Sequence, residues 1–172
     1  FSMPLPCGQM TPAQARSVMK SFAAVFPHCQ LWWNGVDPVM LGGPAPRPLS
    51  SAHWESMRNV PGFFRELARV SGPAALQTRE SLAAALLMTD ADFRAFAREG
   101  DVHVLDRPFL EFEGGQEQSF RSAVEIFEHL SNADAVRRCV DPDFLPDEYW
   151  TSGFALSRTR LINTSVRMAG VM

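Results

Sequence analysis

The segment that most constrains the fold is 9–33, because its residues predict a helix with a defined start and a defined end. Thr11 is a favoured N-cap residue, Pro12 suits the first helical position, and Gln14 completes a capping box. Apolar residues recur at helical spacing until Pro27 ends the helix. Any fold of this chain must therefore accommodate an amphipathic helix in its first part.

A β-hairpin is predicted directly after this helix. Residues 29–33 (CQLWW) and 38–43 (PVMLGG) read as strands, and the sequence NGVD at 34–37 is typical of a turn. Because side chains alternate between the two faces of a strand, we expect Trp32 and Trp33 on opposite faces. One indole then belongs in the core and the other at a partner or domain contact.

The rest of the chain is predicted to be mainly helical, with one further strand at 102–112. The proline-rich stretch 44–49 connects the hairpin to this part. Gly100 is predicted to stop a helix, and the tail beyond Pro146 carries apolar residues on one face of a long helix, although Gly153 weakens it. The predicted helices cover residues 51–58, 61–71, 79–88, 90–99, 119–131 and 133–139.

Composition and charge narrow the class of protein. A length of 172 residues suits one domain with room for an appendage, and the composition is that of a soluble globular protein. With a net charge of -3 and Lys20 as its single lysine, the chain lacks the basic stripe of a nucleic-acid surface. No apolar run approaches the roughly 20 residues of a membrane span. Cys7, Cys29 and Cys139 form no metal-binding or disulfide pattern, so we expect reduced thiols and a cytoplasmic location.

The sequence offers no clear catalytic or metal-binding pattern. Glu125 and His129 stand four residues apart on a predicted helix, which is the spacing of an ordinary surface pair. Cys7 lies in a turn-like PCGQ segment, but a GxSxG elbow and an identifiable histidine partner are missing. The glycine pairs at 42–43 and 114–115 lack the strand-to-helix setting of a phosphate loop. We therefore assign no catalytic residue and no metal ligand.

The sequence LDRPFLEFEGG at 105–115 predicts a short strand whose entrance carries Asp106, Arg107 and Pro108. In one interpretation Asp106 and Arg107 form a local charge-assisted pair that orders the entrance of the strand. In the other, Arg107 braces a neighbouring loop, or Asp106 accepts a hydrogen bond from a substrate amine. The residues alone leave both interpretations open.

Three stretches taken in order resemble the C-terminal part of the spermidine synthase-like family, in particular its bacterial members. They are QMTPAQARSVMKSFAAVFPHCQLWW at 9–33, the helical stretch after the hairpin, and LDRPFLEFEG at 105–114. In that family a helix opened by a Q-L-T-P-E-like segment ends in VFPH before a tryptophan-bearing strand, and an N-T-D-D-R-P-x-L-E-F strand closes the sheet. The resemblance spans about residues 4–114.

The resemblance implies an α/β fold with a partial methyltransferase-like (Rossmann-type) sheet. The C-terminal part of the family's domain would occupy 1–114, with a helical insert at about 50–100, and 115–172 would form a helical tail. Many bacterial members are fused to membrane segments, so the resemblance leaves room for a membrane-fused protein.

The activity implied by the resemblance is polyamine biosynthesis by an aminopropyltransferase. An aminopropyl group would pass from decarboxylated S-adenosylmethionine, the family's co-substrate, to a diamine such as putrescine. Gln9 and Asp106 carry over as substrate-binding positions, and Arg107 as a structural residue near the site. The family's GGGDG-like turn and acidic catalytic loop are missing from this sequence. We therefore expect no cofactor in this chain and no turnover by it alone.

A second interpretation is a non-catalytic binding or assembly module that holds partner chains through the helical insert and the tail. Residues upstream of Phe1 would distinguish the two interpretations. The chain can bind a diamine only if such residues exist and complete the site. A degenerate ligand-binding domain lies between these interpretations. Because half a sheet exposes an edge and an apolar face, we also expect self-association or strand exchange between copies.

Overall fold

The computed structural model describes residues 1–35, 37–71, 76–102 and 121–168. The predicted strand beyond Val102, with Asp106 and Arg107, lies outside the described residues. The chain is a mixed α/β protein that divides into two compact units. The first comprises Phe1–Trp32, Asp37–Pro46 and Leu87–Leu130, and the second Trp33–Val36, Arg47–Leu86 and Ser131–Met172.

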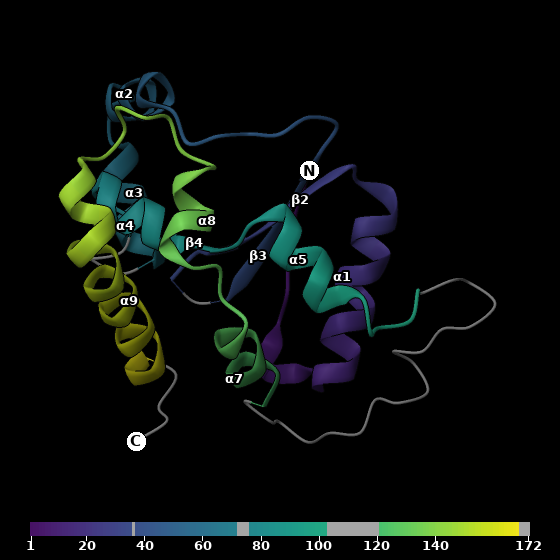
Figure 1. Cartoon of the computed structure of the whole chain (residues 1–172). Coiled ribbons are helices and arrows are strands. Elements are labelled where there is room, and N and C mark those ends of the chain that lie inside the picture. Colours follow the sequence, from purple (N-terminus) through teal and green to yellow (C-terminus); the bar gives the residue numbers. More distant parts are fainter. Residues whose placement is uncertain (36, 72–75, 103–120, 169–172) are drawn as a thin grey trace. The chain divides into compact units, whose positions relative to one another are not determined.

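The first unit combines most of a small sheet with three helices. In chain order its elements are β1 (Ser2–Pro4), the 3-10 turn η1 (Cys7–Gln9), α1 (Pro12–Val25), β2 (His28–Trp33), β3 (Pro38–Gly43), β4 (Leu86–Met88), α5 (Asp90–Ala97) and α7 (Arg121–Glu128). Helix α1 packs against α5, as Figure 1 shows, and also against α7 and β3. Met19, Leu31, Met40 and Phe93 are fully buried and form the centre of the core.

The strands form one four-stranded sheet in the order β1-β3-β2-β4, with β1 antiparallel to β3. The predicted hairpin is confirmed as β2 and β3. In β2 the side chains of Cys29, Leu31 and Trp33 are buried, and those between them are half-buried. This alternation confirms that Trp32 and Trp33 face opposite sides of the strand.

Helix α1 has the start and end that its sequence predicts. The Thr11 hydroxyl accepts the backbone N–H of Gln14, and the Gln14 side chain accepts the backbone N–H of Thr11 at 2.8 Å, so the capping box is complete. The helix ends at Val25, two residues before Pro27. These caps satisfy backbone donors that would otherwise lack a partner at the helix start.

An arginine holds the corner between α1 and β2. The Arg94 guanidinium of α5 donates to the carbonyls of Phe26 at 2.8 Å and Pro27 at 2.7 Å, and its Nε lies 3.1 Å from the Asp90 carboxylate. Asp90 in turn accepts the backbone N–H of Cys29 at 2.7 Å. One side-chain pair therefore satisfies backbone groups on both sides of the corner.

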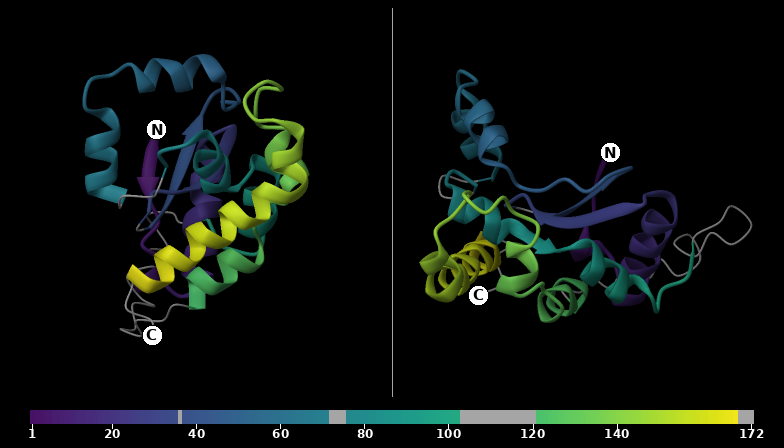
Figure 2. Two further views of the ribbon diagram at one scale, coloured as in Figure 1. Left: turned by 90° about the vertical axis from the view of Figure 1, so that its left-hand side faces the viewer. Right: turned by 45° about the horizontal axis from the view of Figure 1, so that its top comes forward.

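The second unit is helical. Its elements are α2 (Ser51–Arg58), α3 (Phe63–Ser71), α4 (Arg79–Ala85), α8 (Ala133–Arg137), the π-helical turn η2 (Tyr149–Gly153) and α9 (Phe154–Met168). Helix α9, drawn yellow in Figure 2, packs along α4 and against η2. The buried side chains of the second unit include Trp54, Phe144, Leu145 and Trp150.

One prediction of continuous helix is wrong. The helix predicted over 79–88 ends at Ala85, and Leu86–Met88 form strand β4. All three residues of β4 are fully buried, and a short apolar run buried on every side does not distinguish strand from helix by its periodicity.

The predicted long tail helix is confirmed, but its first part is the π-helical turn η2, which leads directly into α9. A Cβ atom on Gly153 would lie 2.7 Å from the Tyr149 ring, so the ring occupies the space beside this glycine. The predicted apolar face is nevertheless present, since Trp150, Phe154 and Leu161 are buried. In the described part of the chain no helix has the length and apolar character needed to cross a membrane.

Candidate functional site

Gln9 is the one predicted substrate-binding residue that the structure describes. It is the last residue of η1 and is exposed, while Cys7 at the start of the same turn is buried. Asp106 and Arg107 lie outside the described residues. The Gln9 amide can both donate and accept hydrogen bonds, which suits an amine ligand.

The two thiols of the first unit are poor nucleophiles. Burial raises the pKa of the Cys7 thiol to about 12, with a smaller contribution from the negative charge of Asp37. Burial also raises the pKa of Cys29, although the nearby Arg94 guanidinium opposes the shift. Because the thiolate is the reactive form, both thiols are inert near neutral pH.

The buried Cys7 thiol predicts a loss of stability at alkaline pH. Its folded-state pKa of about 12 lies above the ordinary thiol pKa of 9.0, so the unfolded chain releases the proton first. Above about pH 9 the free energy of unfolding should therefore fall by up to about 1.4 kcal/mol per pH unit from this group. Urea denaturation between about pH 8 and about pH 10.5 measures the slope. Cys7→Ala should remove the contribution of this thiol to the slope. The same dependence of the free energy of unfolding on pH in both proteins would contradict the assignment of that contribution to Cys7.

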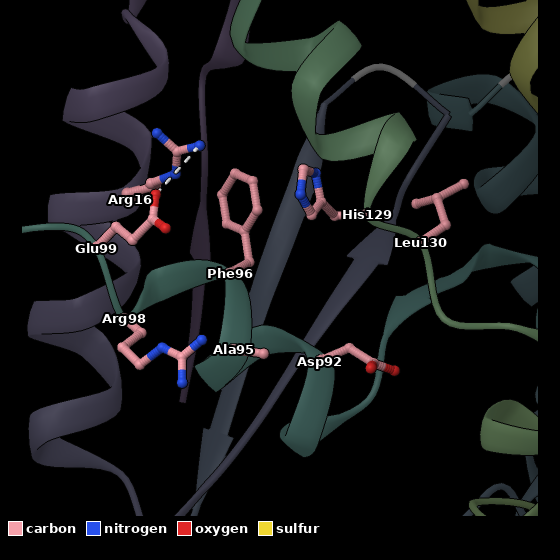
Figure 3. A pocket seen from close by; sticks show the side chains of 8 residues that line it. All are labelled: Arg16, Asp92, Ala95, Phe96, Arg98, Glu99, His129 and Leu130. Atoms are coloured by element: carbon pink, nitrogen blue, oxygen red, sulfur yellow. Dashed lines mark ion pairs between the residues drawn. The ribbon is translucent and has the colours of Figure 1, made fainter.

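A hollow of about 340 Å³ opens on the first unit between α1, α5 and the end of α7. Figure 3 shows Phe96 at its centre, with Arg16 and Glu99 on one side and His129 and Leu130 on the other. The lining residues are Arg16, Asp92, Ala95, Phe96, Arg98, Glu99, His129 and Leu130. Its volume falls within the range of small-molecule sites.

Arg16 is the lining residue that joins the most groups around this hollow. The Arg16 guanidinium forms a salt bridge with Glu125, lies 3.9 Å from Glu99, and lies 5.3 Å from the centre of the Phe96 ring. The His129 ring meets the same phenyl ring edge-on at 5.3 Å. Phe96 is thereby covered by a cation and an imidazole.

The predicted side-chain pair between Glu125 and His129 is wrong. Glu125 gives its carboxylate to Arg16, and His129 Nδ1 lies 2.8 Å from the backbone carbonyl of Glu125. A carbonyl only accepts, so Nδ1 carries the hydrogen and Nε2 is the acceptor nitrogen when the ring is neutral. Glu125 and His129 do lie four residues apart on one helix, but Arg16, which is 109 residues away from Glu125 in the chain, binds the Glu125 carboxylate.

A second hollow, of about 540 Å³, lies on the second unit beside Arg79 and the segment Pro142–Asp147. The Arg79 guanidinium lies 2.9 Å from the Glu55 carboxylate and 3.2 Å from the Phe144 carbonyl. It also lies 5.4 Å from the centre of the Phe144 ring. Arg79 therefore acts as a structural link between α4, α2 and this segment.

The described residues bring together no catalytic set. In residues 1–35, 37–71, 76–102 and 121–168, no group of three or more His, Cys, Asp or Glu side chains could hold a metal ion. The arginines that order the two units, Arg16, Arg79, Arg94 and Arg158, were not singled out by the sequence. Their partners are mostly distant carboxylates and backbone carbonyls, which leave no local sequence signal.

Comparison of the chain with models of known protein families, with curated proteins and with solved structures gave no match in any of the three cases. The resemblance to the spermidine synthase-like family therefore rests on the sequence stretches quoted above.

Proposed function

We propose that this chain is the C-terminal portion of a spermidine synthase-like aminopropyltransferase, whose partial Rossmann-type sheet supplies part of the wall of a diamine site. Gln9 binds the substrate amine in this proposal, with Asp106 as its second contact and Arg107 as a structural neighbour. The groups that bind the nucleoside and carry the chemistry come from residues outside this chain. The isolated chain is accordingly inactive.

The observation that carries the proposal is the way residues 9–33 fold as one unit. The capping box opens α1, the Phe-Pro-His corner follows it, and the tryptophan-bearing strand β2 begins at His28. Arg94 and Asp90 of α5 hydrogen-bond to this corner, so most of the segment that carries the resemblance is held within the first unit. The exposed Gln9 lies before the other end of α1.

The described side chains agree with a supporting role for this chain. The thiols of Cys7 and Cys29 have raised pKa values, which makes them poor nucleophiles. Arg16, Arg79 and Arg94 are engaged in ion pairs and backbone hydrogen bonds. These groups stabilise the two units, and transfer chemistry would need an additional carboxylate placed beside the attacking amine.

The decisive experiment is an assay of the complete gene product from its native source. Its intact mass is first compared with the 19.1 kDa of this chain. The product is then supplied with putrescine and decarboxylated S-adenosylmethionine, and the longer polyamine and the released methylthioadenosine are quantified. A heavier product that forms both compounds supports the proposal, whereas a heavier product without transfer contradicts it.

Gln9 provides a residue-level test in the complete protein. Gln9→Ala removes one amide that would hydrogen-bond a charged amine, so we expect KM for the diamine to rise about tenfold with a smaller change in kcat. Gln77→Ala, in the loop before α4, is the matched control and should leave KM unchanged. Equal effects of the two substitutions, or an effect on kcat alone, would contradict substrate binding by Gln9.

The second candidate function is a non-catalytic binding or assembly module. It is favoured by the hollow of about 540 Å³ that Arg79 of the predicted insert and residues 142–147 of the predicted tail line together. A native product of about the mass of this chain, without transfer activity, would support this role. Co-purification of a defined partner from the native source would then identify what it binds.

A further inference from the structure

The backbone hydrogen bonds of β1 reveal which of its groups face out of the sheet. The N-terminal ammonium of Phe1 donates to the Gly42 carbonyl, and the Gly42 N–H donates to the Phe1 carbonyl, each at 2.9 Å. The Leu5 N–H donates to the Pro38 carbonyl at 2.8 Å. In an antiparallel pair, alternate residues point their backbone groups toward the partner strand. Phe1, Met3 and Leu5 therefore face β3.

Ser2 and Pro4 consequently point their backbone groups to the outer side of β1. Both side chains are exposed, and the strand order places β1 at one end of the sheet. Ser2 presents an N–H and a carbonyl to this edge. Pro4 presents only a carbonyl, because proline has no backbone N–H.

The opposite end of the sheet differs from this edge. The strand at that end, β4, is fully buried along all three of its residues. The Leu86 carbonyl also accepts a hydrogen bond from the buried Arg158 guanidinium. Among the described strands, the exposed edge of the sheet is therefore that of β1.

We propose that Pro4 is an edge-blocking residue, which ends the pairing edge of β1 after Ser2 and prevents a second copy of the chain from adding a strand along it. Natural sheets place proline on exposed edges for this purpose, because each missing N–H removes one hydrogen bond from an incoming strand. On this edge of β1, Ser2 is then the one residue whose backbone can both donate and accept a hydrogen bond to an incoming strand.

The test compares the sedimentation of the whole chain with that of Pro4→Ala across a range of concentrations. Alanine restores an outward N–H without touching the bonds to β3, so we expect the apparent dissociation constant for self-association to fall at least about tenfold. The backbone amide restored by this substitution should also gain protection from hydrogen exchange as the concentration rises. Pro46→Ala, at an exposed proline outside the strands, is the matched control and should sediment like the parent chain.

A second variant tests the orientation of the edge itself. Ser2→Pro removes the remaining outward N–H, so it should weaken association while leaving the thermal unfolding temperature unchanged. The proposal is overturned if Pro4→Ala sediments like the parent chain, if Pro46→Ala associates equally strongly, or if Ser2→Pro unfolds the first unit. A monomeric parent chain with an associating Pro4→Ala variant would support the block, while showing that the intact edge does not self-associate.

Discussion

Replacing Arg158 by methionine should lower the free energy of unfolding of the second unit by about 3 kcal/mol, because it leaves buried carbonyl groups without their donor. The Arg158 side chain is 8% exposed and donates to the carbonyls of Ala84, Leu86 and Ser131. Its guanidinium also lies 4.4 Å from the centre of the Phe154 ring. Burial lowers the pKa of Arg158 to about 10.

Urea denaturation followed by tryptophan fluorescence would measure this loss, and an unchanged dependence on urea would show that the native state stays compact. Arg158→Lys keeps the charge but loses the planar fork that reaches several carbonyls at once, so its stability should be intermediate. Arg160→Met on the exposed side of the same helix is the matched control, with an expected change within about 0.5 kcal/mol. Equal losses for Arg158→Met and Arg160→Met would contradict a buried anchoring role.

Local signals allowed much of the helical structure to be predicted from the sequence. Thr11, Gln14 and Pro27 define α1 because capping and the missing proline N–H act within a few residues. The β2–β3 hairpin was likewise predicted from alternating residues and its turn. Where backbone structure depends on neighbours in sequence, the residues alone are sufficient.

Structure that depends on distant partners was not predictable in this way. The sequence pattern predicts that Leu86, Leu87 and Met88 are the end of a helix, because they continue an apolar run. In the structure they form a strand instead, because they pair in the sheet. Arg94 and Arg158 bind backbone carbonyls far away in the chain, and a carbonyl is present at every residue. No residue pattern marks which carbonyls a long side chain will reach.

The candidate site shows the same division. The PCGQ segment was predicted to be a turn that exposes a small residue, and the turn is confirmed, but tertiary packing buries Cys7 and makes its thiol inert. The spacing of Glu125 and His129 suggested a local pair, whereas Arg16 on α1 binds that carboxylate. For this site, the sequence predicts which residues are available, and tertiary packing decides which of them meet.

Gly100→Ala should destabilise the first unit by about 3 kcal/mol, because the added methyl group would collide with the backbone of α1. A Cβ atom at Gly100 would lie 2.4 Å from the Arg16 carbonyl carbon and 2.6 Å from the Ser17 nitrogen. The prediction that Gly100 stops a helix is confirmed, since α5 ends at Ala97, although the φ of Gly100 is not in the positive region. The glycine instead permits close approach: Lys20 Nζ donates to its carbonyl at 2.5 Å, and the next N–H, of Asp101, donates to Ser17 Oγ at 3.0 Å.

Gly8→Ala is the matched control, because a Cβ atom at Gly8 would meet no atom within 4 Å. Its φ is also outside the left-handed region, so alanine fits without strain and should change stability by less than about 1 kcal/mol, in the stabilising direction. Urea denaturation measures the free energy of unfolding of the two variants. The comparison shows whether close packing or backbone flexibility requires glycine at position 100. Equal losses of stability in Gly100→Ala and Gly8→Ala would contradict the prediction that close packing of Gly100 against α1 requires glycine at this position.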